Sequence, residues 1–141
     1  SPARVTAPVL RVVDGDTIHV LLDGHDVTIR LIGIDTPEAA IPDAPIECFG
    51  RRASDYTHDR LEGRTVDLEF DVERLDRFDR TLAYVWLGEE LLNETLVRRG
   101  YALVTTFPPN VRYVERFTAA QDEARAEGAG LWARETCDGT P

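Results

Sequence analysis

The sequence predicts an α+β domain in which a five-stranded Greek-key β-barrel of the OB type is flanked by three α-helices. Apolar residues alternate with polar ones in five short runs, as strands with one buried face require. Three other stretches place apolar residues at helical intervals, one after the third run and two after the fifth. A parallel sheet would alternate strands and helices regularly, so the order of the elements favours the barrel.

The first three runs predict an antiparallel meander. They lie at about 9–13, 18–22 and 27–31, and Asp14-Gly15-Asp16 and Asp23-Gly24 separate them. Asp-Gly pairs suit tight turns with positive φ. The remaining elements are a helix at about 49–61, strands at 66–70 and 82–86, and helices at 92–99 and 113–127. A glycine follows each helix within two residues and favours its termination there.

The length of 141 residues suits one domain with its own hydrophobic core. We find no repeat or linker and predict a single domain over 1–141, with a core at about 9–132 and a short C-terminal tail. No apolar run approaches the roughly 18 residues of a membrane-spanning helix, so no membrane association is expected. The polar start Ser1-Pro2-Ala3-Arg4 does not have the pattern of a signal peptide and leaves export open.

The charge balance argues against nucleic acid as a partner. The chain has 26 acidic and 16 basic residues, a net charge of -10, and every basic residue is an arginine. Phosphates attract basic surfaces and would repel a uniformly acidic one. The conflict eases if the acidic side chains face outward, as a high-salt habitat would favour, and the arginines converge on one cleft.

The two cysteines, Cys48 and Cys137, lie far apart, so neither has a neighbouring thiol with which to form a CxxC metal or redox site. A long-range disulfide and two unrelated buried thiols both fit this spacing. The spacing alone leaves both open.

Four short segments concentrate charged residues beside the predicted strands. They are Asp14-Gly15-Asp16-Thr17, Arg30, Asp35-Thr36-Pro37-Glu38 and Arg77-Phe78-Asp79-Arg80. Each alone also has a structural explanation, as a turn, a solvated loop or helix start, or a surface ion pair. Together they supply what phosphodiester hydrolysis needs: arginines that neutralise phosphate, a carboxylate base, and oxygen ligands for a hard metal ion such as calcium.

In order along the chain, three segments closely resemble the thermonuclease, or staphylococcal nuclease-like, family. They are VDGDT at 13–17, RLIGIDTPE at 30–38 and DRFDRTLAYV at 76–85. The resemblance extends to 47–50, 92–100 and 130–132 and covers roughly 9–132. It implies an OB-like barrel with three helices and calcium-dependent cleavage of DNA and RNA to 3'-phosphorylated products.

The resemblance also implies roles for individual residues. Arg30 and Arg80 match the arginines that hold the scissile phosphate, and Glu38 matches the general base for the attacking water. One Ca²⁺ ion would be held by Asp16, Asp35 and the backbone carbonyl of Thr36, with Asp14 as a partner behind them. The positions that contact the nucleotide, where the family often has lysines or tyrosines, are here Arg77, Phe78, Thr105 and Phe107. Stacking of rings on bases is therefore retained better than hydrogen bonding through tyrosine hydroxyls.

Two departures from the family pattern bear on substrate capture, which we expect to involve single-stranded or frayed DNA and RNA. Asp79 replaces a glycine of the turn before Arg80 and could alter how that arginine is presented. The loop at 39–46 contains Asp43 and no positive charge, which weakens non-specific binding of a polyanion.

Many secreted relatives place cysteines as Cys48 and Cys137 are placed here. The resemblance therefore favours a disulfide between them and a secreted, monomeric enzyme. Two alternatives are a non-catalytic OB-like module that binds nucleic acid or protein, and an acidic calcium-binding structural domain. The first usually lacks the carboxylates or arginines, and the second gives the arginines no role.

Overall fold

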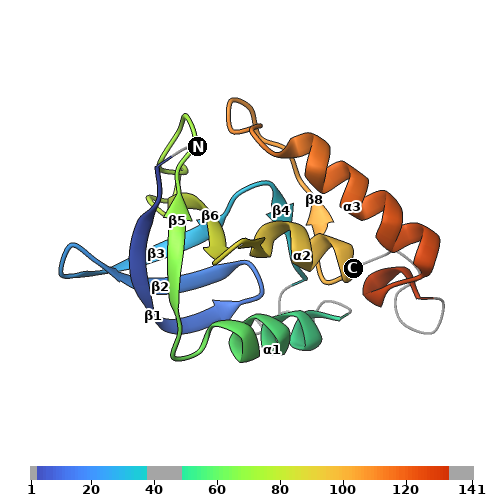
Figure 1. The fold of residues 1–141 in the computed structure, drawn as a ribbon, viewed down its shortest axis with the longest axis horizontal. Helices are drawn as coiled ribbons and strands as arrows, with labels where there is room; N and C mark the ends of the chain where they lie inside the picture. Colours follow the sequence, from blue (N-terminus) through green and yellow to red (C-terminus); the bar gives the residue numbers. More distant parts are fainter. Residues whose placement is uncertain (1–2, 38–48, 134–141) are drawn as a thin grey trace.

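The computed structural model describes residues 3–37 and 49–133. Within them, five long strands form a closed barrel and three α-helices lie beside it (Figure 1). The strands are β1 (Val5–Asp14), β2 (Thr17–Leu22), β3 (His25–Leu31), β5 (Thr65–Glu69) and β6 (Thr81–Leu87). The helices are α1 (Gly50–Leu61), α2 (Leu92–Arg98) and α3 (Val114–Glu127). The short elements are β4 (Ile34–Asp35), β7 (Glu90–Leu91), β8 (Leu103–Val104) and the 3-10 helix η1 (Gly130–Trp132).

The barrel closes through a parallel contact. β1 pairs antiparallel with both β2 and β5, and β5 pairs antiparallel with β6. β6 then runs parallel to β3, with Arg30 opposite Leu82, which joins the two ends of the sheet. The predicted α+β barrel with three helices is confirmed, and each helix lies within one residue of its expected bounds.

Both predicted hairpin turns are present, but only the one at Asp23-Gly24 has the positive φ expected of an Asp-Gly pair, since Gly15 does not have it. Asp23 and Gly24, which join β2 to β3, have φ of 53° and 80°. Two consecutive residues with positive φ suit the twist of a two-residue hairpin. Gly15 and Asp16 join β1 to β2 and hold the first carboxylate of the candidate site at the end of the barrel.

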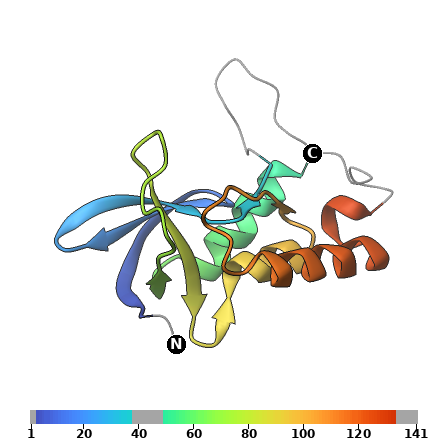
Figure 2. The ribbon, with the colours of Figure 1, turned by 90° about the horizontal axis from the view of Figure 1, so that it is seen from above.

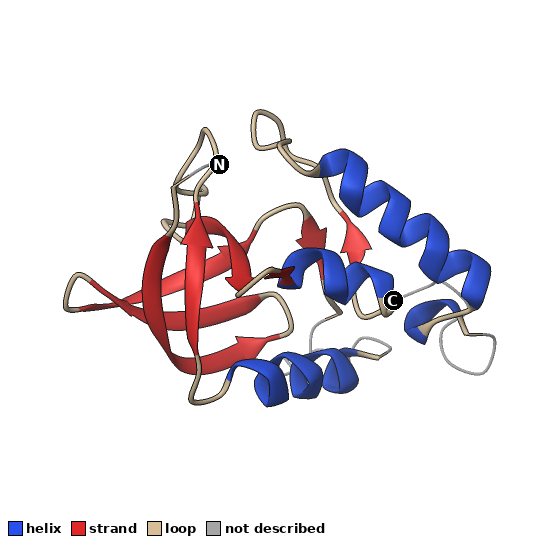
Figure 3. Ribbon diagram, viewed as in Figure 1, coloured by secondary structure: helices blue, strands red, loops and turns tan. Residues whose placement is uncertain are grey.

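The helices cover the barrel unequally. α1 packs on β1, whereas α2 packs between β6 and α3 (Figures 1 and 2). Figure 3 shows the barrel strands on one side of the molecule and α2 and α3 together on the other. Among the described residues, no helix has the length and apolar character needed to cross a bilayer.

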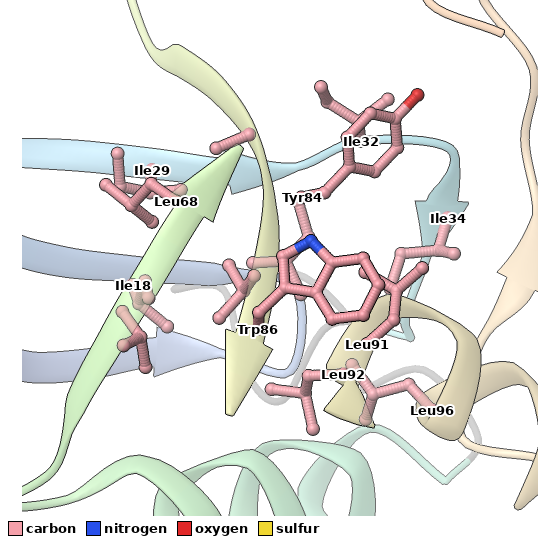
Figure 4. Close-up of a cluster of buried hydrophobic side chains, with 14 of the residues drawn as sticks. Ile18, Ile29, Ile32, Ile34, Leu68, Tyr84, Trp86, Leu91, Leu92 and Leu96 are labelled. Atoms are coloured by element: carbon pink, nitrogen blue, oxygen red, sulfur yellow. The ribbon is translucent and has the colours of Figure 1, made fainter. Parts of the chain in front are cut away.

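One hydrophobic core joins the barrel to α2. Figure 4 shows it running from Ile18, Ile29 and Leu68 of the barrel to Leu92 and Leu96 of α2. The alternation predicted for 82–86 is wrong in one respect, since all four residues from 83 to 86 are buried. β6 lies between the barrel and the helices, so both of its faces are covered.

Asn93 of α2 fixes the segment that leads into the candidate site. Its side chain is fully buried, its amide nitrogen donates to the carbonyl of Ile32 at 2.8 Å, and its oxygen accepts the Val85 amide at 2.9 Å. The stretch between β3 and β4 is therefore held to both α2 and β6.

Candidate active site

The first carboxylate and the first arginine come together at one end of the barrel. Thr17, which follows Asp16, pairs with Arg30 across the β2–β3 ladder. The amide of Leu31 also donates to the carbonyl oxygen of Asp16 at 2.9 Å. Antiparallel pairing therefore brings Asp16 beside Arg30.

Arg30 is held by the end of its own strand. Its Nη1 donates to the carbonyl oxygens of Leu31 at 2.7 Å and Ile34 at 2.8 Å. Its Nη2 lies 3.2 Å from Asp16 Oδ2 and 3.3 Å from Asp35 Oδ1. With only 16% of its side chain exposed, Arg30 has a fixed guanidinium whose charge lies between two carboxylates.

The carboxylate of Asp16 is held from two sides. Its Oδ2 accepts the amide of Thr36 at 3.0 Å, and its Oδ1 accepts the hydroxyl of Thr17 at 3.0 Å. The hydroxyl oxygen of Thr36 is buried and has no hydrogen-bond partner among the described residues. A Cβ on Gly15 would lie 2.9 Å from this threonine side chain, so the turn needs a glycine there.

These groups fit a hard divalent cation. The carboxylates of Asp16 and Asp35, together with the carbonyl and hydroxyl oxygens of Thr36, are ligands of the kind that Ca²⁺ takes. The described residues contain no cluster of three or more His, Cys, Asp or Glu side chains suited to a metal. Asp14, at the end of β1, pairs with Thr17 in the ladder and lies beside this group.

The second arginine, Arg80, is presented by a tight turn before β6. Its Nε donates to Asp76 Oδ2 at 2.7 Å. Among the described residues its two terminal nitrogens have no hydrogen-bond partner. Asp79, which replaces the family's usual glycine, has a φ of 63° and adopts the left-handed backbone that glycine favours. The departure noted in the sequence therefore leaves the glycine-like turn intact.

Both arginines line the same cavity, which has a volume of about 560 Å³. Its floor is formed by residues 31–34 and Leu82, and its rim carries the rings of Phe78 and Phe107. The two rings are 64% and 70% exposed, which leaves them open to a ligand. A cavity with an apolar floor, lined by three arginines and by the carboxylates of Glu73 and Asp76, has the size and chemistry of a nucleotide site.

The other nucleotide-contact positions lie around this cavity in different ways. Arg77 lines it, with its guanidinium carbon 4.9 Å from the centre of the Phe78 ring. Thr105 is half-buried and donates its amide to the carbonyl of Gly33 at 2.9 Å. The structure thus brings Arg77, Phe78 and Phe107 together, whereas Thr105 serves the backbone beneath them.

Three predicted site residues, Glu38, Cys48 and Cys137, lie outside the described residues, as does the loop at 39–46. The general base and the disulfide therefore stay predictions.

Two side chains that line the cavity, Asp76 and Asn110, were not among the site residues predicted from the sequence. Asn110 is buried, donates to the carbonyl of Glu73 at 2.9 Å and accepts the Glu73 amide at 2.8 Å. It ties the loop that carries Phe107 to the loop that leads to Arg80. An aspartate two residues before Phe78 is a turn signal that could have identified Asp76, while nothing local marks Asn110.

Comparison with known proteins places this geometry in a family. A family model described as "Staphylococcal nuclease homologue" matches residues 28–134. The thermonuclease of Staphylococcus hyicus is 44% identical over 128 residues, which cover 91% of this chain and 76% of that protein. The thermonuclease of Staphylococcus intermedius is 44% identical over 126 residues, covering 89% and 75%. The SPbeta prophage-derived endonuclease YokF of Bacillus subtilis (strain 168) is 36% identical over 126 residues, covering 88% and 43%.

These relatives are named as nucleases, which favours the enzyme over the binding module and the structural calcium domain. The family-model match spans all three helices and both arginines of the cavity. The chain therefore belongs to the staphylococcal nuclease, or thermonuclease, family and is a hydrolytic nuclease.

Proposed function

We propose that this nuclease hydrolyses single-stranded or frayed DNA and RNA in a Ca²⁺-dependent reaction that leaves 3'-phosphorylated products. The observation that carries the proposal is the shared cavity of Arg30 and Arg80, with a pair of carboxylates directly behind Arg30. Two guanidinium groups facing one space can bind a single phosphodiester from two sides.

Arg30 and Arg80 would neutralise the charge that builds up on the phosphoryl oxygens in the transition state. Asp16, Asp35 and the carbonyl of Thr36 would hold Ca²⁺, and Asp14 would support them. When bound, the ion would supply further positive charge next to the reacting phosphate. Glu38, which the family motif assigns as general base, would orient and deprotonate the attacking water.

The exposed rings suggest how the substrate is gripped. Phe78 and Phe107 would stack on bases, and Arg77 would contact a neighbouring phosphate. Bases must be unpaired to reach such rings, which supports a preference for single-stranded or frayed substrate. The net charge of -10 makes a broad electrostatic attraction unfavourable, so binding would depend on these local contacts.

We also propose that the chain acts as one secreted, monomeric domain with a disulfide between Cys48 and Cys137. Such a bond would close a loop of about 90 residues and stabilise the fold by a few kcal/mol. The mass of the intact chain before and after reduction and alkylation tests the bond. An unchanged count of alkylated thiols would contradict it.

The test of the activity is cleavage of a labelled single-stranded oligonucleotide in Ca²⁺ and in excess chelator, with product ends identified by mass spectrometry. We expect 3'-phosphates in Ca²⁺ only, and a loss of at least about 100-fold in rate for Arg30→Ala and Glu38→Gln. Cleavage that persists in chelator, or near-normal rates in these variants, would contradict the proposal. Arg125→Ala on α3 serves as a control that removes an exposed arginine away from the cavity.

A further inference from the structure

The turn that carries Arg80 is built around one carboxylate, that of Asp76. Its Oδ1 accepts the amides of Phe78 at 2.8 Å and Arg80 at 2.9 Å. Its Oδ2 accepts the side-chain Nε of Arg80 at 2.7 Å. The amide of Asp76 donates in turn to the carbonyl of Arg80 at 2.9 Å. One side chain therefore fixes both the backbone and the guanidinium of the arginine.

Among the described residues, the Arg80 side chain makes no other hydrogen bond, so its two terminal nitrogens stay available. A guanidinium is planar, so a hydrogen bond at Nε sets the direction in which the two terminal nitrogens point. Arg30 is held in the opposite way, since its terminal nitrogens donate to Leu31, Ile34 and the carboxylates. Of the two arginines, Arg80 is the one whose fork is available for bidentate binding of a phosphate.

Asp76 also has an unfavourable effect on phosphate binding, because its carboxylate beside Arg80 lowers the positive potential at the cavity. Burial raises the pKa of Asp76, but the hydrogen bonds from the Arg80 and Phe78 amides and from the Arg80 side chain outweigh it and hold the pKa below its ordinary value. The group is therefore an anion at neutral pH. Such an arrangement is favourable for catalysis only if orientation of the fork matters more than the lost charge.

We propose that Asp76 is a positioning residue of the nuclease, which aims the terminal nitrogens of Arg80 at the scissile phosphate. The inference rests on the proposed role of Arg80. It goes beyond that role because it makes the turn geometry, and a negative charge, part of the catalytic machinery of an enzyme whose substrate is a polyanion.

The test is Asp76→Asn. The remaining oxygen can still accept the backbone amides of the turn, while the new amide group places a donor against Arg80 Nε. We expect a folded protein whose kcat falls about 10- to 100-fold with little change in KM, since a misplaced catalytic group costs about that much. If this variant does not fold, Asp76→Ser is the second test. The serine hydroxyl can still accept the backbone amides of the turn, but its side chain is too short to reach Arg80 Nε, and the same loss of kcat is expected.

Glu123→Gln is the matched control. The Glu123 carboxylate accepts a hydrogen bond from Arg98 Nε at 3.1 Å. The substitution therefore changes the same type of contact, but between α2 and α3 and away from the cavity. We expect its kcat to stay within twofold of the parent. A comparable loss in this control would show that any arginine–carboxylate pair matters, and would overturn the inference.

A double variant separates positioning from a general structural effect. In an Arg80→Ala background, Asp76→Asn should cause no further loss, because Asp76 acts through Arg80. Additive losses would overturn the inference. Hydrogen exchange of the Arg80 Nε–H, followed by NMR, should be slow in the parent and fast in Asp76→Asn.

The two proposals fail in different ways. A parental rate in Arg80→Ala would remove the proposed role of Arg80 itself. A loss in Arg80→Ala combined with a parental rate in Asp76→Asn would overturn the positioning role alone.

Discussion

The turn before Asp16 offers a perturbation that reaches the proposed metal site without touching a ligand. Gly15 does not have the left-handed backbone, so an alanine there is strained by contact alone. Its Cβ would lie 2.9 Å from Thr36 Cγ2 and Oγ1 and 3.0 Å from Thr36 Cβ. Rotation of the side chain moves Cγ2 and Oγ1 but not Cβ, so Thr36 itself must shift.

The size of the effect follows from what that shift disturbs. Overpacking of this kind costs about 1–3 kcal/mol of stability. The Thr36 amide donates to Asp16 Oδ2, and a hydrogen bond to a charged group contributes about 1.5–3 kcal/mol. Both residues are proposed Ca²⁺ ligands, so the second loss should appear in the affinity for the ion. Since about 1.4 kcal/mol is tenfold, we expect Gly15→Ala to weaken Ca²⁺ binding about 10- to 100-fold.

Isothermal titration calorimetry, together with the rise in melting temperature caused by Ca²⁺, measures the affinity. The control is Gly24→Ala in the next hairpin turn, where φ is 80° and nothing lies within 4 Å of the added Cβ. It should lose about 1–2 kcal/mol of stability from the left-handed backbone and bind Ca²⁺ normally. Normal binding by Gly15→Ala, or an equal loss of binding in Gly24→Ala, would refute the reasoning.

Three further predictions concern stability and salt. Gly100→Ala should destabilise the fold by about 2–5 kcal/mol in urea unfolding, because its Cβ would lie 2.1 Å from the carbonyl oxygen of Ala129. Gly63→Ala is the control, since Gly63 has the same left-handed backbone but open space around the added Cβ, and it should cost about 1–2 kcal/mol. Burial raises the pKa of Glu94, but hydrogen bonds from Arg116 and Arg98 outweigh this effect and lower the pKa. The ionised carboxylate therefore stabilises the fold above about pH 4.3, and this stabilisation is lost as the pH falls through the lowered pKa. Glu94→Gln should flatten this loss of stability in urea titrations between pH 6 and 3. If three arginines make the phosphate contacts, the logarithm of the affinity for single-stranded DNA should fall with the logarithm of salt concentration at a slope of about -2, and a slope beyond about -4 would contradict a local grip.

Local patterns predicted the elements of the fold and their order favoured a barrel, but no local pattern showed which strands pair to close it. The hairpin at Asp23-Gly24 and the three helix ends depend on residues close in sequence, and each appears where expected. The parallel contact of β3 with β6 joins segments far apart in the chain, and it has no local signal. The burial of both faces of β6 follows from α2 packing against it and from the contact of Phe117 of α3 with Tyr84, so alternation along the strand could not reveal it.

The candidate site divides in the same way. Arg30, Asp16 and Arg80 stand in short motifs, and the structure brings the first two into contact and the third onto the same cavity. The hydrogen bonds of Asp76 and Asn110 depend on turn shapes and on loops that meet only in the folded chain. Their residue types are ordinary for loops, so sequence alone could not assign them to the site.

The acidic composition and the nuclease activity are reconciled by how the arginines are distributed. Arg11, Arg60, Arg98 and Arg116 each pair with a carboxylate, so their charges are largely compensated on the protein itself. At the cavity, Arg77 has no carboxylate partner among the described residues, and the two terminal nitrogens of Arg80 have none there either, although its Nε pairs with Asp76. A phosphate in the cavity would therefore meet positive charge at short range, although the chain as a whole has a net charge of -10. Net charge reports the whole surface, whereas binding at a short contact depends on the few groups within a Debye length of about 8–10 Å.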